Sequence, residues 1–558
     1  MKVALALILV FSFLISGYHA ISSSQSLGQN SFPDLYEASV LELQDGLDAG
    51  RFTSVDLIKA YFARIDEVNL QGPELRAVIE TNPSALAQAA ELDAERAVLG
   101  KRSALHGIPI LLKDNIATVA SEGMNTTAGS FSLLDSVVPE DAGVVKRLRK
   151  AGAIILGKAN LSEFAHFRGN LASGWSGRGG QSKGAYFPGA DPCGSSSGSG
   201  IAASIGLAAV TLGSETDGSI TCPASQNNVA GIKPTVGLTS RAGVIPISSH
   251  QDTIGPITRS VTDAAIVLSV IAGKDPNDNF TLAQPPFVPD YTQALRKGAL
   301  AGKRIGVPRK VFLDPSLAGL DQPVLDAFED ALETIKLLGA TVVDPADLPS
   351  AEDILRSNNE SIVLDVDFKI ELNRYFAGLI KNPSGVRTLA DLIKFNDDHP
   401  DLEEPTNFTD QLIESEATNG FNAAYFNALS IDRELGGSMG IDAALKEFDL
   451  DALVLPSQGF TTTIAAIVGY PIVTVPLGFY PDNFTIESAG PETVYPAPGV
   501  PFGLSFFASA FSELDLIGYA FAYEQQTHTR LTRKAFPEAI PSTQLRDIVG
   551  NRIPSHAS

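Results

Sequence analysis

Short apolar runs without charged residues alternate with longer, helix-like segments along most of the chain. Runs such as 153–157, 209–212 and 472–476 are typical of strands that are buried on both faces of a sheet. Segments such as 54–65 and 323–338 instead place apolar residues at helical spacing. Because this alternation continues over the full length, it predicts an α/β fold rather than separate helical and strand regions.

Composition limits the size of the core and the class of partner. The chain has 558 residues, of which 44% are hydrophobic, so one large core is possible and length alone does not require several domains. Its 64 acidic residues outnumber 41 basic residues, which gives a net charge of −23. Such a charge disfavours nucleic acids and other polyanionic partners.

Three local patterns add detail to this outline. Ser54 precedes an amphipathic run and is expected to cap its helix. The segment 169–200 is long and rich in Gly, Ser and Pro, which in a compact domain indicates a functional or disordered loop. Residues 381–410 are polar and contain prolines, which indicates an insertion at the surface.

The first 20 residues have the pattern of a secretory signal peptide. Lys2 is followed by an apolar stretch from Val3 to Ile15 and then by small residues. This stretch is too short to span a bilayer comfortably, since about 20 residues are needed. We therefore expect residues 1–20 to be removed and residues 21–558 to be secreted, without stable insertion in a membrane; an uncleaved anchor is the alternative.

If the chain is secreted, its six Asn-X-Ser/Thr sequences are candidate glycosylation sites, since such sequences accept glycans in secreted proteins. Asn279 and Asn483 lie in polar, proline-containing segments and are the most favourable acceptors. Asn160 lies in a segment that we expect to be packed, which argues against its use. The six sequences begin at Asn125, Asn160, Asn279, Asn359, Asn407 and Asn483.

One lysine and two serines predict a hydrolase that needs no histidine. Ser195 and Ser219 each follow a glycine in a loop-like segment, and Lys113 follows the uncharged run 107–112. A serine hydroxyl is a weak nucleophile until a base takes its proton, and a lysine is a base only when burial keeps it neutral. In this interpretation Ser219 attacks, Ser195 relays the proton and Lys113 accepts it. Asp114 would oppose this unless its side chain turns toward other donors.

The turn formed by Thr216, Asp217, Gly218 and Ser219 suits an oxyanion hole. Consecutive N–H groups in a glycine-containing turn can point into one concavity and stabilise the oxyanion of acyl transfer. Each such donor lowers the barrier by about 3 kcal/mol. A flexible Gly/Ser loop is the alternative for either serine motif alone. A phosphate loop is disfavoured, because the Gly-Lys-Ser/Thr ending is missing.

Histidine and cysteine could support other mechanisms. His106 lies near Lys113 in sequence, but no serine here has the strand–turn–helix context of a nucleophile elbow, so a Ser-His-Asp triad is disfavoured. Cys and His do not cluster at metal-ligand spacing, which argues against a metal. The two cysteines, Cys193 and Cys222, flank the serine motifs and form either a disulfide or two buried thiols.

These segments resemble the elements of the amidase signature family in residues, order and separation. The resemblance covers most of residues 34–535 and implies a single large α/β domain within 21–558, with a mixed central sheet flanked by helices and no cofactor. The motifs that carry it are Lys113-Asp114-Asn115, Gly194-Ser195-Ser196-Ser197-Gly198-Ser199 and Thr216-Asp217-Gly218-Ser219-Ile220, within core motifs at 103–260, and a closing strand at 501–506.

The resemblance also implies a role for each matching residue. Ser219 matches the nucleophile, Ser195 matches a serine held by a cis peptide bond that shuttles the proton, and Lys113 matches the base. The backbone N–H groups of residues 216–219 match the oxyanion hole.

Two departures narrow the resemblance to one branch. Asp217 stands where many members have a second glycine, and Thr221 stands where many have arginine. Together with Cys193 and Cys222, these departures resemble the peptide amidase branch, which removes the amide from the C-terminus of peptides. The expected function is therefore hydrolysis of a carboxamide, in a small molecule or a peptide, through an acyl-enzyme on Ser219.

Three other functions remain open at this point. A catalytically silent, secreted binding protein on the same fold is disfavoured because all three catalytic positions are filled. A fatty-acid or aryl amide hydrolase would use the same chemistry on another acyl group. An ammonia-supplying component of a tRNA-dependent amidotransferase is disfavoured by the signal peptide and the acidic charge.

Overall fold

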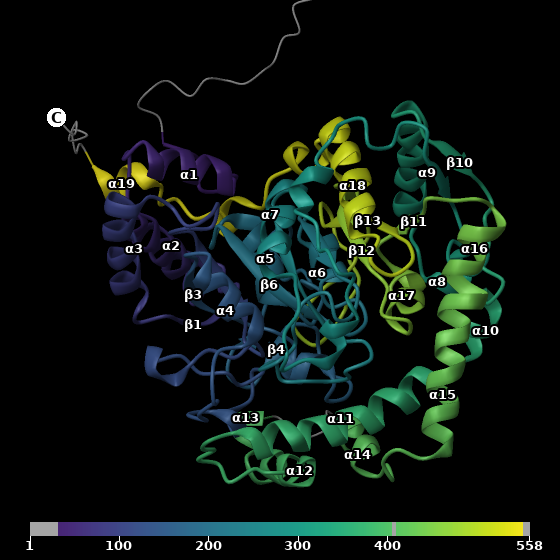
Figure 1. Ribbon diagram of the computed structural model, residues 1–558, viewed down its shortest axis with the longest axis horizontal. Helices are drawn as coiled ribbons and strands as arrows, with labels where there is room; N and C mark the ends of the chain where they lie inside the picture. The colour runs from purple at the N-terminus through teal and green to yellow at the C-terminus, as the bar shows by residue number, and fades with distance from the viewer. Residues whose placement is uncertain (1–31, 404–408, 551–558) are drawn as a thin grey trace, which may run out of the picture.

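Eleven of the described strands form one mixed sheet through the middle of the molecule, with helices on both of its faces (Figure 1). The computed structural model describes residues 32–403 and 409–550. The predicted signal peptide, residues 1–20, and the acceptor Asn407 lie outside the described residues. The predicted α/β class, with a mixed sheet in a single large domain, is confirmed.

The strands follow the alternation seen in the sequence. They are β1 (Val78–Thr81), β2 (Pro109–Lys113), β3 (Ile154–Ala159), β4 (Trp175–Ser176), β5 (Gly180–Gln181), β6 (Val210–Glu215), β7 (Ala230–Lys233), β8 (Thr253–Thr258), β9 (Arg304–Gly306), β10 (Thr341–Val343), β11 (Ala452–Pro456), β12 (Ile472–Phe479) and β13 (Pro501–Phe507). The large sheet has the order β1-β3-β2-β6-β8-β7-β12-β13-β11-β9-β10, and β4 pairs with β5 apart from it. Strand β2 runs parallel to β3 and β6, whereas β8, β7, β12 and β13 pair antiparallel with their neighbours.

The helices cover both faces of this sheet and extend beyond one side of it. They are α1 (Val40–Asp48), α2 (Ser54–Val68), α3 (Ala85–Leu99), α4 (Gly143–Lys150), α5 (Ser197–Ile205), α6 (Thr221–Gln226), α7 (Val261–Ile271), α8 (Pro315–Ala318), α9 (Gln322–Leu337), α10 (Ala351–Arg356), α11 (Asn359–Gly378), α12 (Leu389–Asp398), α13 (Pro400–Glu403), α14 (Asp410–Glu416), α15 (Ala423–Arg433), α16 (Asp442–Glu447), α17 (Thr463–Ala466), α18 (Glu513–Thr527) and α19 (Leu545–Val549). Among the described residues, no helix is both long enough and apolar enough to cross a bilayer.

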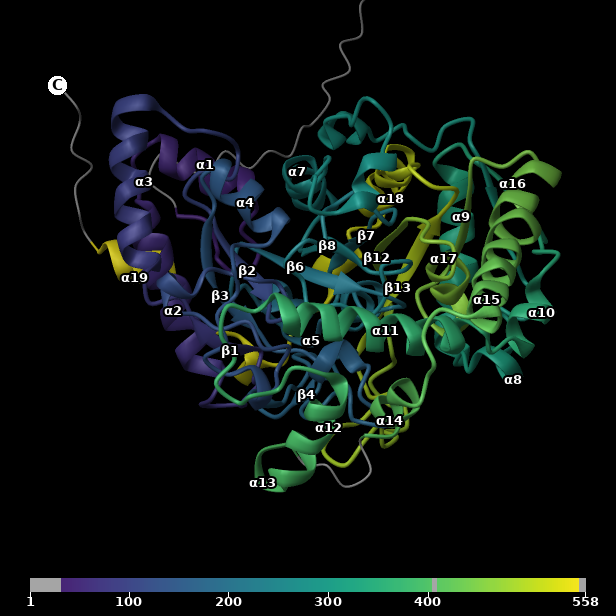
Figure 2. The same ribbon diagram turned by 60° about the horizontal axis from the view of Figure 1, so that its bottom comes forward.

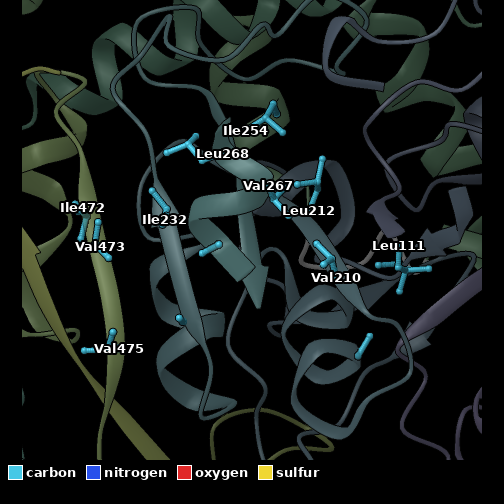
Figure 3. Packing of buried hydrophobic residues seen from close by; sticks show 14 of the residues in the cluster. Leu111, Val210, Leu212, Ile232, Ile254, Val267, Leu268, Ile472, Val473 and Val475 are labelled. Carbon is cyan, nitrogen blue, oxygen red and sulfur yellow. The ribbon is translucent and has the colours of Figure 1, made fainter. Parts of the chain in front are cut away.

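Fully buried aliphatic side chains fix the middle of the sheet (Figure 3). Leu212 of β6, Ile254 of β8 and Ile232 of β7 lie on strands that are neighbours in the sheet. Val267 and Leu268 of α7 are equally buried, and α7 packs on β7 and β8. Burying one such side chain stabilises the fold by about 1.5–3 kcal/mol, so this packing holds β6 firmly.

Helix α5 explains why the Gly/Ser run is not a flexible loop. All of its residues are buried, and Ser199 donates through Oγ to the carbonyl oxygen of Leu212, at 2.9 Å. A Cβ at Gly198 would lie 2.1 Å from the carbonyl oxygen of Ala77. Only a residue without a side chain fits there, because real Cβ atoms do not approach backbone so closely. The small residues thus allow α5 to pack closely against the strands of the sheet.

Two local expectations need correction, and a third segment gains detail. The N-cap of α2 is Thr53, which forms a capping box with Asp56, and Ser54 is the first helical residue. Segment 169–200 contains the β4–β5 pair, and segment 381–410 contains α12 and α13. Sequence reasoning took 169–200 as a loop and assigned no helix to 381–410, because their short elements lack a clear apolar period; that 381–410 is an insertion stays a prediction.

The described residues of 351–403 and 409–447 form a helical layer, here called the roof, whose helices were not predicted from the sequence. It comprises α10 to α16, and Figure 2 shows α11 crossing in front of the central strands. Leu364 and Phe368 of α11 belong to the main core, whereas Val363 and Val366 pack with α15 in a separate small cluster. Two buried faces on one helix connect the roof to the sheet.

Candidate active site

Strand β2 brings Lys113 to the sheet edge where the candidate site forms. Leu112 of β2 lies beside Leu212 of the parallel strand β6, so the carboxyl ends of both strands meet at one edge. Lys113 is fully buried. Its Nζ donates to Ser195 Oγ at 2.8 Å and to the carbonyl oxygen of Ser214 at 3.0 Å.

The surroundings of Lys113 favour its neutral form. Burial lowers its pKa to about 7, although the carboxyl groups of Asp252 and Glu215 act in the opposite direction. Asp114, the expected opponent, is turned away: its Oδ2 accepts from the N–H groups of Thr127 at 3.2 Å and Gly129 at 3.0 Å. A substantial fraction of Lys113 is therefore neutral near pH 7 and able to accept a proton.

The two serine loops lie against each other. The peptide bond between Gly194 and Ser195 is cis, and the N–H of Ser196 donates to the carbonyl oxygen of Ser219 at 3.2 Å. Ser219 is 7% exposed, and within the described residues its hydroxyl has no hydrogen-bond partner. The structure therefore brings Lys113 and Ser195 into direct contact and Ser219 onto the adjoining loop. Their catalytic roles stay predictions.

Glu215, which sequence reasoning missed, shapes the predicted oxyanion turn. Its carboxylate accepts from the N–H groups of Gly218 at 3.0 Å, Ile220 at 2.6 Å and Thr221 at 2.8 Å. The N–H of Gly218, expected to face an oxyanion, is therefore already bonded. Those of Asp217 and Ser219 have no protein acceptor among the described residues.

Asp252 is a second missed residue. One of its oxygens accepts from Thr216 Oγ1 at 2.6 Å, and the other accepts from the N–H of Ile247 at 2.8 Å. It thereby joins the oxyanion turn to another wall of the cavity. A buried acid beside a motif is the signal that could have identified both Glu215 and Asp252, since an interior carboxylate needs several donors.

Cys193 and Cys222 form a disulfide, which settles the question that their sequence left open. The S–S distance is 2.02 Å and the two Cα atoms lie 5.8 Å apart. The bond joins the segment before Ser195 to α6, which follows Ser219. Both serine loops are therefore tied together covalently.

A cavity of about 320 Å³ opens beside Ser219. Phe167, Ile247 and Leu364 give it an apolar wall, and Leu364 comes from α11 of the roof. Polar residues, among them Ser173, Thr216 and Asp217, also line it. The lining residues are Ala165, His166, Phe167, Ser173, Gly194, Thr216, Asp217, Ser219, Ile247 and Leu364.

The histidine beside this cavity is His166, not His106. Both ring nitrogens of His106 face backbone groups, with Nε2 3.0 Å from the carbonyl oxygen of Leu92 and Nδ1 accepting from the N–H of Arg102 at 3.2 Å. His166 lies in a left-handed stretch of backbone, with φ of 76°. Burial, and then the nearby Lys113, lower its pKa to about 4, so it is neutral near pH 7. No sequence pattern marked it.

Comparison with known proteins agrees with this geometry. The family model described as Amidase matches residues 56–517. The chain belongs to the amidase signature family. It is therefore an amidase, a hydrolase that acts on C–N bonds, and the resemblance drawn from the three motifs is confirmed.

Solved and curated relatives extend this result. The structure of native peptide amidase from Stenotrophomonas maltophilia is 44% identical with a TM-score of 0.81, and the match covers 91% of this chain and 99% of that one. A probable amidase of Arabidopsis thaliana is 43% identical over 519 residues, covering 92% and 94% of the two chains. One subunit of the glutamyl-tRNA(Gln) amidotransferase of Geobacter metallireducens is 33% identical over 511 residues, covering 89% and 99%.

Proposed function

We propose that this amidase hydrolyses a carboxamide through an acyl-enzyme on Ser219 and that the C-terminal amide of a peptide is its substrate. The observation that carries the proposal is the contact between the buried Lys113 and the hydroxyl of Ser195. It supports a base that acts through a serine, without histidine or a cofactor.

In the proposed reaction, Ser219 Oγ attacks the carbonyl carbon while its proton passes to Ser195, which gives its own proton to neutral Lys113. The N–H groups of Asp217 and Ser219 stabilise the oxyanion. The C–N bond then breaks, and the leaving nitrogen takes a proton from Lys113 through Ser195, so ammonia departs. Water attacks the ester by the same proton path and releases the carboxylic acid and free Ser219.

The cavity and the comparisons support a peptide substrate. Phe167, Ile247 and Leu364 supply apolar surface for an acyl side chain, and a peptide amidase is among the similar structures. A fatty-acid or aryl amide would use the same surface and is the main alternative. An ammonia-supplying component of a tRNA-dependent amidotransferase is another alternative, because one subunit of such an enzyme is similar to this chain. The net charge of −23 disfavours a tRNA partner.

A substrate screen with an active-site label tests the proposal. Peptide amides, fatty amides and aryl amides are compared by kcat/KM for release of ammonia or amine, and a fluorophosphonate is mapped by mass spectrometry. We expect peptide amides to be preferred and Ser219 to carry the label. Preference for another class would replace the substrate, whereas neither label nor turnover would favour a silent binding protein.

We also propose that the protein is a secreted glycoprotein. Asn279 and Asn483 are exposed, whereas Asn160 is buried and its side chain is hydrogen-bonded to backbone. Expression of the full chain in a eukaryotic secretory host, with the mass measured before and after endoglycosidase, tests this. Retention of the protein in the cell would contradict secretion, and a mass that endoglycosidase does not change would contradict glycosylation.

A further inference from the structure

Three carboxyl groups from separate elements meet beside the Ser219 cavity. Asp217 lies on the oxyanion turn, Glu360 in the first turn of α11 and Asp432 near the end of α15. Asp217 and Asp432 both act electrostatically on Glu360. The group therefore joins the catalytic turn to two helices of the roof, which Figure 2 shows on the same side of the sheet.

One member of this carboxyl group lines the cavity and a second is linked to its wall, because Gln251 Nε2 donates to Glu360 at 2.7 Å and to the carbonyl oxygen of the lining residue Thr216 at 3.5 Å. Asp217 lines it together with Ser219, two positions later in the chain. Leu364 of α11 also lines it, and Glu360 lies one helical turn earlier on the same face. A substrate whose carbonyl carbon meets Ser219 therefore has its acyl half close to these carboxyl groups.

The protein leaves two oxygens of the group without donors. Asp432 is 2% exposed and its Oδ2 has no hydrogen-bond partner, and the same holds for the buried Oδ1 of Asp217. Thr463 donates only to the other oxygen of Asp217, and Gln251 donates to one oxygen of Glu360. A buried polar atom without a partner is costly, so it calls for a ligand.

No described lysine or arginine forms an ion pair with Asp217, Glu360 or Asp432. The buried Lys233 acts on Asp217 from a distance, but its Nζ donates to the carbonyl oxygen of Tyr470. The described residues also contain no group of side chains that could hold a metal ion. The described protein side chains therefore supply no cation to this group, and an organic cation would bring the donors that its oxygens lack.

We propose that Asp217, Glu360 and Asp432 form a subsite for a positively charged group, an ammonium or guanidinium, on the acyl half of the substrate. An ammonium has three N–H donors and a guanidinium has five, which suits several carboxylate oxygens that lack donors. The inference rests on the proposed function, because the acyl half is defined by attack of Ser219.

The protonation of the empty subsite is consistent with this assignment. Burial, and then Asp217, raise the pKa of Glu360 to about 8, and burial raises the pKa of Asp432 to about 7. Burial also raises the pKa of Asp217. Burial thus favours the protonated forms of these groups when no cation is present, and a bound cation would favour their ionised forms.

The cation has two possible sources. One is the side chain of a C-terminal lysine or arginine residue, and the other is the free α-ammonium of an amino-acid amide. Two pairs of substrates separate them. N-acetyl-lysinamide against N-acetyl-norleucinamide tests the side chain, and leucinamide against N-acetyl-leucinamide tests the α-ammonium.

The measurement is the ratio of kcat/KM within each pair. A charge-assisted contact predicts that the cationic member of one pair is preferred by about 10- to 100-fold in the wild type. Glu360→Gln and Asp432→Asn should each bring that ratio close to one. Asp365→Asn is the matched control, because it removes a carboxylate from α11 that hydrogen-bonds to Gln411 and Ser415 of α14 instead, and it should keep the ratio.

The results separate this inference from the proposed function. The subsite is overturned if neutral amides are turned over and neither cationic substrate is preferred. It is also overturned if both variants keep the preference. Either result leaves the proposed amidase reaction intact. Absence of turnover with every amide overturns both. If Asp432→Asn does not fold, Glu360→Gln alone decides, since Glu360 lies in the first turn of its helix and is only partly covered.

Discussion

The loops beside the strands β2, β6 and β8 and helix α11 of the roof line the same cavity, but the strands and the roof are built differently. Every residue of β2, β6 and β8 is buried. The roof instead exposes large apolar side chains such as Phe421 and Phe426, the latter by 58%, and has a small cluster of its own. Lys113, the proposed base, therefore lies on a strand whose residues are all buried. Leu364, the proposed substrate contact, lies on a helix of the more exposed roof.

The two regions also differ in charge. The strands hold three buried lysines, Lys113, Lys158 and Lys233, and burial lowers the pKa of each. The roof contributes Glu360 and Asp432, whose pKa values burial raises. Burial also raises the pKa of Glu215 in β6 and of Asp252 before β8, so a low dielectric favours neutral groups in both regions, and the buried lysines are what distinguishes the strands. Among the lysines, Lys113 is the one bonded to Ser195, so chemistry is expected from it.

The largest effect is expected from Ser219→Ala, in the turn that follows β6. Without the nucleophile, kcat/KM for a peptide amide should fall by at least about 10⁴-fold. The hydroxyl makes no hydrogen bond in the described structure, so the free energy of unfolding should change by less than about 1 kcal/mol. Amide turnover and thermal unfolding are measured on the same preparation. Near-normal turnover in a folded variant would refute the assignment.

The second effect concerns Lys113→Ala, which should lower kcat/KM by about 10²- to 10⁴-fold. In the wild type, kcat/KM should rise with pH through about 7, because the base is protonated below the pKa of Lys113 and free above it. This limb lies well below the ordinary lysine value of about 10.4. The variant should lose the limb.

Lys158→Met is the matched control for that pH profile. Lys158 is also buried with a lowered pKa, but its Nζ donates to the carbonyl oxygen of Ile116 and to Thr126. A folded Lys158→Met enzyme should keep the rise near pH 7. If the same rise persists in Lys113→Ala instead, another group is the base.

The contrast between the two regions explains what the sequence could predict. Ser195 and Ser219 were predicted because they stand in short segments rich in glycine and serine, and Lys113 was predicted because it follows the uncharged run 107–112. The strands were found because charge-free runs must be buried. Leu364 and Asp432 lie on helices with weakly amphipathic patterns, and only the long-range packing of α11 and α15 brings Leu364 to the cavity and Asp432 near Glu360. His166 depends on a left-handed loop that no local pattern indicates.

The third effect tests the covalent link between the serine loops. The double variant Cys193→Ser, Cys222→Ser should lower the free energy of unfolding by about 3–4 kcal/mol, because the unfolded chain regains the freedom that the loop closure removed. Thermal unfolding at a fixed scan rate measures this. Reductant should shift the wild type toward the variant and leave the variant unchanged; equal stability of the two proteins would show that the link is dispensable.

The smallest effect is expected in the roof, from Leu364→Ala. Leu364 contacts the acyl half of the substrate in the proposed reaction, and loss of its apolar surface should raise KM about tenfold, or about 1.4 kcal/mol, for a peptide amide with an apolar C-terminal residue. The value of kcat should change less, because among the described residues Lys113 is hydrogen-bonded to Ser195 and Ser214, and the two serine loops to each other, rather than to Leu364. Leu364→Met, which conserves volume, should restore most of the affinity. A loss in kcat without a change in KM would instead show that the roof positions the reacting groups, and the separation between the two regions would fail.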